Sequence, residues 1–423
     1  MAVVAVVGAQ WGDEGKGKVI DTFVPNVDLL VHWAGGAHLG QSMAVAGERL
    51  VFDLLPSGPL RAGRTCLLAQ GMTIDPEVLL DERDAMEKHD ILKGELLVCQ
   101  RAHVVLPHHR LLDELRGEAE GASGARRSGI GPCYGDKLAR RGVQVGDLLL
   151  ERRLRERLTR SIEGRAAVIE ALGGKVPEVE PILESYLALG RRMKPMIVDG
   201  SRRIMDRVKW GGDVLLEGLL GTMVDLELGS YPYVVAANTV AAGACVGTGI
   251  APSAIDNVLG VAKVYATRAG KGPFPSELTG DLAQQLREAG GEIAAHSGKP
   301  RRIGMFDIPA LRFATRVNGF GSIALTKMDV LSGIDNVPVC TAYDLDGDLL
   351  DEPPFAGQSR ATPKMEMLPG WKESLHDCRS WDDLPVNARK FVEFIEEKAE
   401  VRVSLIGVGP DRSETIVRGD PFG

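Results

Sequence analysis

The sequence predicts a single continuous α/β domain over residues 1–423, with a parallel sheet that begins near its N-terminus. Within the first fifty residues, short apolar runs at 3–7 and 28–32 alternate with glycine-rich turns, a pattern typical of strand–helix units. Strand-like runs return further along the chain, at residues 214–216, 258–265, 323–326 and 401–406. No internal repeat, low-complexity tract or linker divides the sequence, so we expect one domain with insertions.

Residues 151–210 differ from this pattern and predict an inserted helical subdomain. Leu154, Leu158 and Ile162 recur four residues apart among arginines and glutamates, which is typical of a helix with one buried stripe and solvated charged faces. A second helical stretch follows Pro181, and a C-terminal helix is expected around residues 388–399.

The composition predicts a cytoplasmic enzyme. Hydrophobic residues make up 44% of the chain, and 50 basic against 58 acidic side chains give a net charge of −8, which argues against binding to nucleic acid. No apolar stretch approaches the length of about 18 residues that a membrane span needs. The N-terminus lacks the features of a signal peptide, and the six cysteines are scattered, so we expect reduced thiols and no zinc site.

The strongest local signal is a glycine- and lysine-rich segment at residues 8–18, directly after the first apolar run. Gly12 to Lys18 fits the spacing of a phosphate-binding loop, in which backbone N–H groups and a helix N-terminus surround phosphate oxygens. The usual hydroxyl residue is replaced by Val19, so magnesium needs another ligand, and Asp13 is the candidate. Lys16 or Lys18 can contact the transferred phosphoryl group. The alternative interpretation is an ordinary glycine-rich turn with solvated charges.

Residues 10–18, Gln-Trp-Gly-Asp-Glu-Gly-Lys-Gly-Lys, resemble the signature of the adenylosuccinate synthetase family. Further matches to the family extend along the whole chain, at residues 55–58, 129–132, 137–142, 231–233, 272–275, 325–329 and 409–412. The resemblance implies a large, mainly parallel central sheet flanked by helices, with P-loop-like binding of GTP, assembled as a homodimer. It also implies a purine-biosynthesis ligase that uses GTP and magnesium to phosphorylate the 6-oxygen of IMP and then displaces phosphate with the amine of aspartate.

The resemblance assigns roles to the residues of the first loop and of the following glycine segment. Asp13 matches the general base and a magnesium ligand, and the carbonyl of Gly40 matches a second magnesium ligand. The phosphate contacts carried over from the loop are Gly12, Glu14, Gly15, Lys16, Gly17 and Lys18.

The segment 326–329, Thr-Lys-Met-Asp, is predicted to read the base of the nucleotide. The Asp329 carboxylate can accept both N1–H and the exocyclic amine of guanine, which selects GTP over ATP, while the stem of Lys327 covers the base. Gly407 and Gly409 are expected to form the other wall of this pocket, and Arg301 to direct a cation toward the nucleotide. Taken alone, this short motif is more often a surface turn.

The predicted proton donor departs from the family pattern. The family's histidine in the segment after the second strand is Gln41 here, which can donate a hydrogen bond to an oxyanion but cannot transfer a proton. His38 lies three residues upstream. It is a candidate replacement for the acid, and filling the structural position of the family's asparagine is the equally open interpretation.

The predicted acceptor pocket also departs from the family. A Thr-Thr-Gly-Arg segment becomes Ala-Arg-Arg-Ser, which removes hydroxyl donors and places Arg126 and Arg127 nearby. Val235 stands where the family has a threonine, and Leu220 where it has a glutamine that holds the hypoxanthine. Arg140 matches an arginine that reaches into the partner subunit's acceptor site, with Arg141 as its structural alternative.

The predicted amine-donor loop, residues 296–302, retains part of its polar set. His296 and Ser297 begin it, and Ser297 keeps a hydroxyl. Lys299 replaces the arginine that grips the aspartate carboxylate, and a lysine lacks the two-pronged geometry of a guanidinium.

These departures lead to three hypotheses. The first is a GTP-dependent ligase whose acceptor is another nucleotide or a carboxylate, joined to an amine such as aspartate rather than the standard pair. The second is an ordinary adenylosuccinate synthetase that tolerates the changes. The third is a catalytically poor, GTP-binding regulatory relative.

Overall fold

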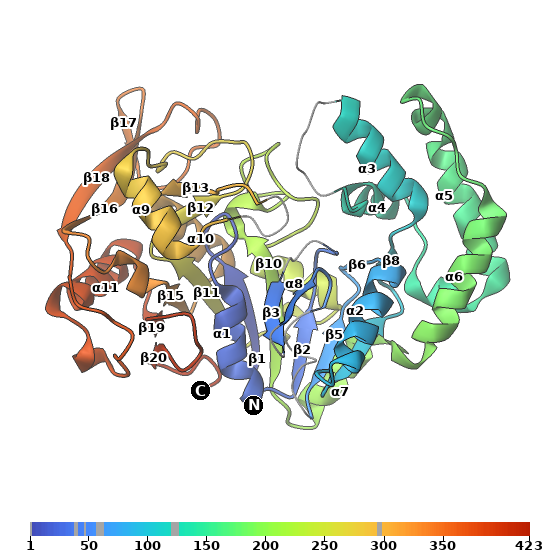
Figure 1. Ribbon diagram of the computed structural model, residues 1–423, viewed down its shortest axis with the longest axis horizontal. Helices are drawn as coiled ribbons and strands as arrows, with labels where there is room; N and C mark the ends of the chain where they lie inside the picture. The colour runs from blue at the N-terminus through green and yellow to red at the C-terminus, as the bar shows by residue number, and fades with distance from the viewer. Residues whose placement is uncertain (1, 38–40, 46–47, 56–62, 120–126, 294–297) are drawn as a thin grey trace.

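The computed structural model describes residues 2–37, 41–45, 48–55, 63–119, 127–293 and 298–423. Its centre is a ten-stranded sheet with the strand order β20-β19-β15-β11-β1-β10-β2-β5-β7-β9 (Figure 1). Every neighbouring pair in this sheet is parallel except β19 and β20, which are antiparallel. The expected large, mainly parallel sheet is thereby confirmed. The strands are β1 (Val3–Gly8), β2 (Leu29–His32), β5 (Thr65–Leu68), β7 (Glu95–Cys99), β9 (Ile197–Val198), β10 (Val214–Gly221), β11 (Asn257–Lys263), β15 (Ser322–Thr326), β19 (Val403–Gly407) and β20 (Thr415–Val417).

Both faces of this sheet are buried, which explains why its strands are continuous apolar runs rather than alternating patterns. In β1, Val3, Ala5 and Val7 belong to one hydrophobic cluster. Val4 and Val6 belong to the cluster on the opposite face. Successive side chains of a strand point to opposite sides, so one run supplies both cores.

Helices cover the two faces (Figure 1). On one face, buried side chains of α1 (Lys16–Phe23), α2 (Pro76–Lys88), α5 (Glu151–Ala171) and α6 (Val179–Met193) join the same cluster as Val4. On the other face, the covering helices are α7 (Gly200–Lys209), α8 (Ala241–Thr248), α9 (Asp281–Gly290), α10 (Ile308–Asn318) and α11 (Val386–Ala399). None of the helices in the described residues is long and apolar enough to cross a membrane.

Residues 151–210 contain the helices α5, α6 and α7 and the edge strand β9. Leu154, Leu158 and Ile162 are buried on one face of α5, as their spacing predicts. Figure 1 places α5 and α6 at one end of the molecule, beyond α3 (Pro107–Ala119) and α4 (Ile130–Leu138). β9 is an addition to the expectation, because a strand of two residues leaves no periodic signal.

Smaller sheets surround the main one. A four-stranded sheet joins β14 (Phe306–Asp307), β16 (Asn336–Leu345), β17 (Asp348–Leu350) and β18 (Thr362–Pro369). Three two-stranded pairs are β3 (Gln41–Val45) with β4 (Glu48–Phe52), β6 (Thr73–Ile74) with β8 (His103–Val104), and β12 (Ala266–Arg268) with β13 (Arg302–Gly304).

The parallel sheet determines where a site can form. The carboxyl ends of β1, β10, β11, β15 and β19 meet at one edge, because these strands are parallel neighbours. Ligands of open α/β sheets bind at this edge. The segments predicted to bind phosphates and guanine all follow the carboxyl ends of these strands.

Candidate active site

The phosphate loop connects β1 to α1 in a tight turn. Its backbone is left-handed at Gly12, Asp13 and Gly15, with φ of 101°, 59° and 85°. A Cβ atom at Gly12 would lie 3.1 Å from a side-chain carbon of Leu220, and one at Gly15 would lie 3.3 Å from the Thr326 hydroxyl. Both positions therefore favour glycine in conformation and in space. The turn directs the N-terminus of α1, a position suited to an anion, toward the loop.

Glu14 lies beneath the loop. Its carboxylate is fully buried and accepts hydrogen bonds from the backbone N–H groups of Gln10 at 3.1 Å and Gly12 at 2.9 Å. It also accepts one from Lys16 Nζ at 2.6 Å. The sequence suggested that Glu14 contacts the nucleotide. That contact stays a prediction, and in this structure the carboxylate holds the loop and Lys16.

Leu220, at the end of β10, contributes to the same loop through its backbone. The pairing of β1 with β10 shifts register just before Gly221, and Leu220 takes a left-handed φ of 46°. Its carbonyl accepts a hydrogen bond from Lys16 Nζ at 2.5 Å. The side chain of Lys16 is 11% exposed, so Glu14 and Leu220 together fix the direction of this cation.

Lys18 faces the predicted wall of the guanine pocket. Its Nζ donates hydrogen bonds to the carbonyls of Gly409 at 2.5 Å and Glu414 at 2.9 Å. A Cβ atom at Gly407 would lie 3.2 Å from this ammonium. Burial lowers the pKa of Lys18, while the carboxylates of Asp329 and Glu414 act in the opposite direction. Lys18 therefore links α1 to the wall segment, in addition to any contact with phosphate.

Asp329 presents an unused hydrogen-bond acceptor. It lies in a short 3₁₀ helix after β15, and Lys327 just before it has a left-handed φ of 61°. The Oδ1 atom of Asp329 is buried and has no hydrogen-bond partner within the described residues. Burial raises the pKa of its carboxyl, while a backbone hydrogen bond and the charges of His376, Lys18 and Lys327 lower it. Buried acceptors in proteins are normally paired, so this oxygen fits a donor supplied by a ligand.

The base-reading segment and the phosphate loop are in direct contact. The hydroxyl of Thr326 donates a hydrogen bond to the backbone carbonyl of Glu14. Only β11 separates β1 from β15 in the sheet, so the segments that follow these two strands lie close together. The arrangement suits a nucleotide with its phosphates at the first segment and its base at the second.

Asp13 is accessible and paired with a cation. Its side chain is 42% exposed, and its Oδ2 lies 2.9 Å from Arg301 Nε. Arg301 also donates a hydrogen bond from Nη1 to the Glu292 carboxylate at 2.9 Å. The predicted general base and the predicted nucleotide-directed arginine are thus brought together.

The described residues of the predicted acceptor side lie in varied settings. Val235 is half-buried and packs against the main hydrophobic cluster, as Leu220 does. Arg127 lies against α3, where a Cβ atom at Gly117 would come within 2.8 Å of its Nε. Arg140 is exposed in the turn after α4, whereas Arg141 donates a hydrogen bond to the carbonyl of Gly164 at 2.7 Å.

Other predicted residues are placed only partly. Lys299 is exposed, and Gly17 lies in α1 with open space next to its Cα. Gln41 begins β3, and its side chain lies outside the description. Five predicted site residues fall outside the described residues, namely His38, Gly40, Arg126, His296 and Ser297.

The structure adds a buried charged group that the sequence analysis did not identify. Lys263, Tyr265 and Glu292 meet beside the predicted guanine segment, and all three are buried. The sequence signals were Lys263, a lysine at the end of an apolar run, and Glu292, a single glutamate that follows two glycines. Neither signal is specific without the three-dimensional arrangement.

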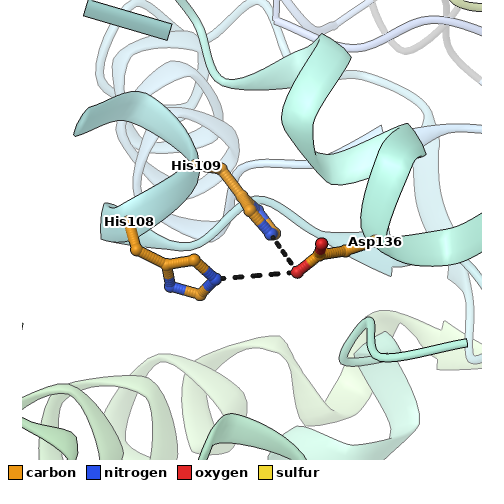
Figure 2. Close-up of side chains that lie close together, drawn as sticks. All are labelled: His108, His109 and Asp136. Carbon is orange, nitrogen blue, oxygen red and sulfur yellow. Dashed lines mark hydrogen bonds and ion pairs between the residues drawn. The ribbon is translucent and has the colours of Figure 1, made fainter. Parts of the chain in front are cut away.

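A second polar group lies where α3 meets α4, with His108 and His109 on α3 and Asp136 on α4 (Figure 2). His108, His109 and Asp136 are fully buried, and their potential ligand atoms lie within 4.8 Å of one another. His109 Nδ1 accepts a hydrogen bond from the Leu106 N–H at 3.1 Å, so its Nε2 carries the proton that faces Asp136 at 3.3 Å. The ring therefore has no lone pair to offer a metal ion.

Asp136 is satisfied from several sides. The Ser161 hydroxyl donates to it at 2.8 Å, and Arg165 Nε donates at 2.6 Å. Burial would raise the pKa of Asp136, but hydrogen bonds from His108, His109 and Ser161 hold it below its usual value. Burial lowers the pKa of His109 to about 4. We interpret the group as a structural network that joins α3, α4 and α5.

Comparisons with known proteins match nearly the whole chain to one family. A family model described as adenylosuccinate synthetase matches residues 5–416. The adenylosuccinate synthetase of Sorangium cellulosum is 45% identical over all of both chains, and that of Anaeromyxobacter sp. (strain K) is 46% identical over 100% of this chain and 99% of its own. The structure of fully ligated adenylosuccinate synthetase from Plasmodium falciparum matches with a TM-score of 0.89 and 32% identity, covering 99% of this chain and 100% of that one.

Proposed function

Because the chain belongs to the adenylosuccinate synthetase family, we propose that it joins IMP and aspartate at the expense of GTP to form adenylosuccinate. Membership makes it a GTP-dependent carbon–nitrogen ligase that uses magnesium. The observation that supports the proposal most directly is the buried carboxylate oxygen of Asp329, which has no hydrogen-bond partner in the described part of the chain and lies beside an intact phosphate loop. The third hypothesis, a regulatory GTP binder, is set aside.

The residues of this chain suit the two steps of that reaction. In the first step, the 6-oxygen of IMP attacks the γ-phosphorus of GTP, GDP leaves, and Asp13 accepts the N1 proton of the purine. Lys16, held by Glu14 and the Leu220 carbonyl, directs one positive charge at the transferring group. In the second step, the amine of aspartate attacks C6 and forms the C–N bond, the C6–O bond breaks, and the phosphate leaves with the oxygen and takes up the proton that the amine loses.

Magnesium fits at Asp13, whose exposed carboxylate lies in the phosphate loop. Oxygen ligands are those that magnesium prefers. The ion would neutralise charge on the phosphate oxygens. Gly40, the second predicted ligand, lies outside the described residues. Because Asp13 pairs with Arg301 through Oδ2, the ion would bind through Oδ1.

The relatives favour the ordinary substrate pair over the non-standard pair that the sequence departures suggested. Two relatives that are 45% and 46% identical along the whole chain carry the name adenylosuccinate synthetase. A physical reason also supports the ordinary pair at one departure. Leu220 holds Lys16 through its carbonyl, so loss of a side-chain amide there leaves this part of the phosphate site in place.

A non-standard acceptor remains the second candidate because of one observation. The side chains of Leu220 and Val235 are only partly buried, so their exposed part offers apolar surface where the family presents polar groups. Such a surface suits an acceptor with fewer polar groups than IMP at that position.

The homodimer is a further part of the proposal. Arg140 is exposed and Arg141 is bonded to its own subunit, so Arg140 is the one suited to reach a partner's acceptor site.

The test is direct. The purified protein is supplied with GTP, magnesium, IMP and aspartate, and GDP, phosphate and adenylosuccinate are separated and quantified over time. We expect equal amounts of the three products and turnover of about 1 per second or faster, the ordinary range for enzymes. Asp13→Asn is the control that should abolish product formation. GTP cleavage that requires a different acceptor, without adenylosuccinate formation, would favour the second candidate and contradict the first.

A further inference from the structure

Glu292 is a buried carboxylate that accepts four hydrogen bonds from side chains. It follows α9, and its side chain has no exposed surface. Its Oε1 accepts from Lys263 Nζ at 2.8 Å, from Lys327 Nζ at 2.8 Å and from the Tyr265 hydroxyl at 2.6 Å. Its Oε2 accepts from Arg301 Nη1 at 2.9 Å. One carboxylate therefore orients three cations.

Two of these cations belong to the proposed nucleotide site. Lys327 directly follows β15, within the base-reading segment, and its ammonium is directed at Glu292 and at the Gly290 carbonyl, 2.6 Å away. Because these two acceptors hold the ammonium, the aliphatic part of the Lys327 side chain is fixed in position. A fixed side chain of this kind can cover the plane of a base. Arg301 stands against Asp13 at 2.9 Å.

Glu292 also closes the base of the predicted amine-donor loop. The Arg301 N–H donates a hydrogen bond to the Glu292 carbonyl at 3.0 Å, and an isolated bridge pairs Ile293 with Pro300. The backbone and the carboxylate of Glu292 thus both bind Arg301, one residue before the end of the loop predicted at residues 296–302. The same residue contacts the base-reading segment through Lys327.

The third cation connects this centre to the phosphate loop. Lys263 is fully buried at the end of β11, and its backbone N–H and carbonyl are both bonded to the side-chain amide of Gln10, at 3.1 and 2.9 Å. Burial lowers the pKa of Lys263 to about 8, although Glu292 acts to raise it. Burial would raise the pKa of Glu292, yet Lys263 and Lys327 lower it to about 2. The carboxylate is therefore charged at neutral pH.

We propose that Glu292 is a positioning residue, which holds Lys327 over the guanine and Arg301 beside Asp13 from a single buried charge. The inference rests on the proposed function, because Lys327 and Arg301 matter only if guanine nucleotide binds at this edge of the sheet. Through Glu292, the segment that covers the guanine and the base of the amine-donor loop are held together and respond to a mutation as one unit.

The test measures binding of GDP by calorimetry, so it does not depend on which acceptor or amine the enzyme uses. Glu292→Gln keeps the shape of the side chain and removes its charge. We expect GDP affinity to fall about 10- to 100-fold, the factor that corresponds to one lost hydrogen bond to a charged group. Tyr265→Phe is the matched control, because it removes one hydrogen bond to the same oxygen and leaves the charge. Its GDP affinity should stay close to that of the unmodified protein.

Glu292→Gln removes the carboxylate charge that Lys263 and Lys327 share, which can prevent folding, whereas Arg301 keeps its ion pair with Asp13. The double variant Glu292→Gln, Lys263→Met removes one buried cation together with the carboxylate charge and restores local balance. It should fold, as followed by circular dichroism, and still bind GDP about 10- to 100-fold more weakly.

A double-mutant cycle between Lys327 and Glu292, measured by GDP affinity, distinguishes a positioning role from a merely structural one. Lys327→Met should weaken GDP binding in the protein that retains Glu292 but have little further effect in the double variant, because Lys327 is then already released. If Lys327→Met costs the same affinity in both backgrounds, or if a folded Glu292 variant binds GDP normally, the inference is wrong. If the unmodified protein fails to bind GDP, the proposed function itself is contradicted.

Discussion

Replacing Asp329 with asparagine is expected to change which nucleotide the enzyme uses. The Oδ1 atom of Asp329 is buried without a partner in the described structure, so the carboxylate has acceptor capacity reserved for a ligand. Guanine offers N1–H and an exocyclic amine to it. Asparagine keeps one acceptor but turns an N–H₂ group toward one of these donors, so one hydrogen bond is lost and the facing donors repel.

The magnitude follows from the number of hydrogen bonds involved. A hydrogen bond to a charged group is worth about 1.5 to 3 kcal/mol, so losing one of the two should lower kcat/KM for GTP by at least about 10- to 100-fold, and the repulsion between facing donors adds to this loss. Xanthosine triphosphate presents an oxygen where guanine has its amine, so Asp329→Asn should use it better than the unmodified enzyme does. Burial also raises the pKa of Asp329, so KM for GTP should rise as the pH falls toward that pKa and the carboxylate is protonated.

The assay compares kcat/KM for GTP, ATP and xanthosine triphosphate in both proteins. Asp335→Asn is a matched control, because Asp335 lies in the next turn, is 74% exposed on its side chain, and has its Oδ1 3.4 Å from the Lys372 ammonium. It should leave all three values unchanged. Equal use of ATP and GTP by the unmodified enzyme, or unaltered nucleotide preference in Asp329→Asn, would refute the assignment.

Three further predictions concern stability, assembly and the acceptor. Burial lowers the pKa of His109 from 6.5 to about 4, so between these pH values the folded protein binds fewer protons than the unfolded chain. The free energy of unfolding should therefore fall by up to about 3 kcal/mol as the pH drops from 6.5 to 4. His109→Gln should make the free energy of unfolding, measured by urea denaturation, less dependent on pH in this range. Mixing Arg140→Leu subunits with Asp13→Ala subunits should partly restore activity if active sites are shared, and verified heterodimers without recovery would exclude sharing. Leu220→Gln combined with Val235→Thr should raise kcat/KM for IMP by about tenfold or more, because the new side chains can form two hydrogen bonds to IMP. No gain would mean that these positions do not contact the acceptor.

The sheet was predictable where a strand carries its own signal. The apolar runs at 3–7 and 323–326 lie within β1 and β15, because strands buried on both faces need no alternating pattern. The sheet formed by β16 and β18 carried no such signal. Pro338, Pro363 and Pro369 interrupt its strands, and most of β18 is exposed.

The candidate site was predictable from motifs but not in its internal contacts. Spacing singled out Asp13 and Asp329 as candidates, because each follows a strand in a recognisable segment, and their roles stay predictions. Spacing could not indicate that the Glu14 carboxylate turns inward, since that depends on the left-handed backbone around it. Glu292 was missed for another reason, because its side-chain partners come from three separate segments: Lys263 and Tyr265 at and after the end of β11, Arg301 just before β13, and Lys327 just after β15.

The hydrogen bond from Thr326 to the Glu14 carbonyl joins residues that are 312 positions apart. A guanine nucleotide that spans them would bridge the first strand of the sheet and a strand formed from the last quarter of the chain. Neither half can hold the ligand before the other is in place, so nucleotide affinity appears only once the intervening strand β11 has been inserted between them. By mass action the nucleotide then stabilises the folded sheet as a whole, and not just the loops it touches.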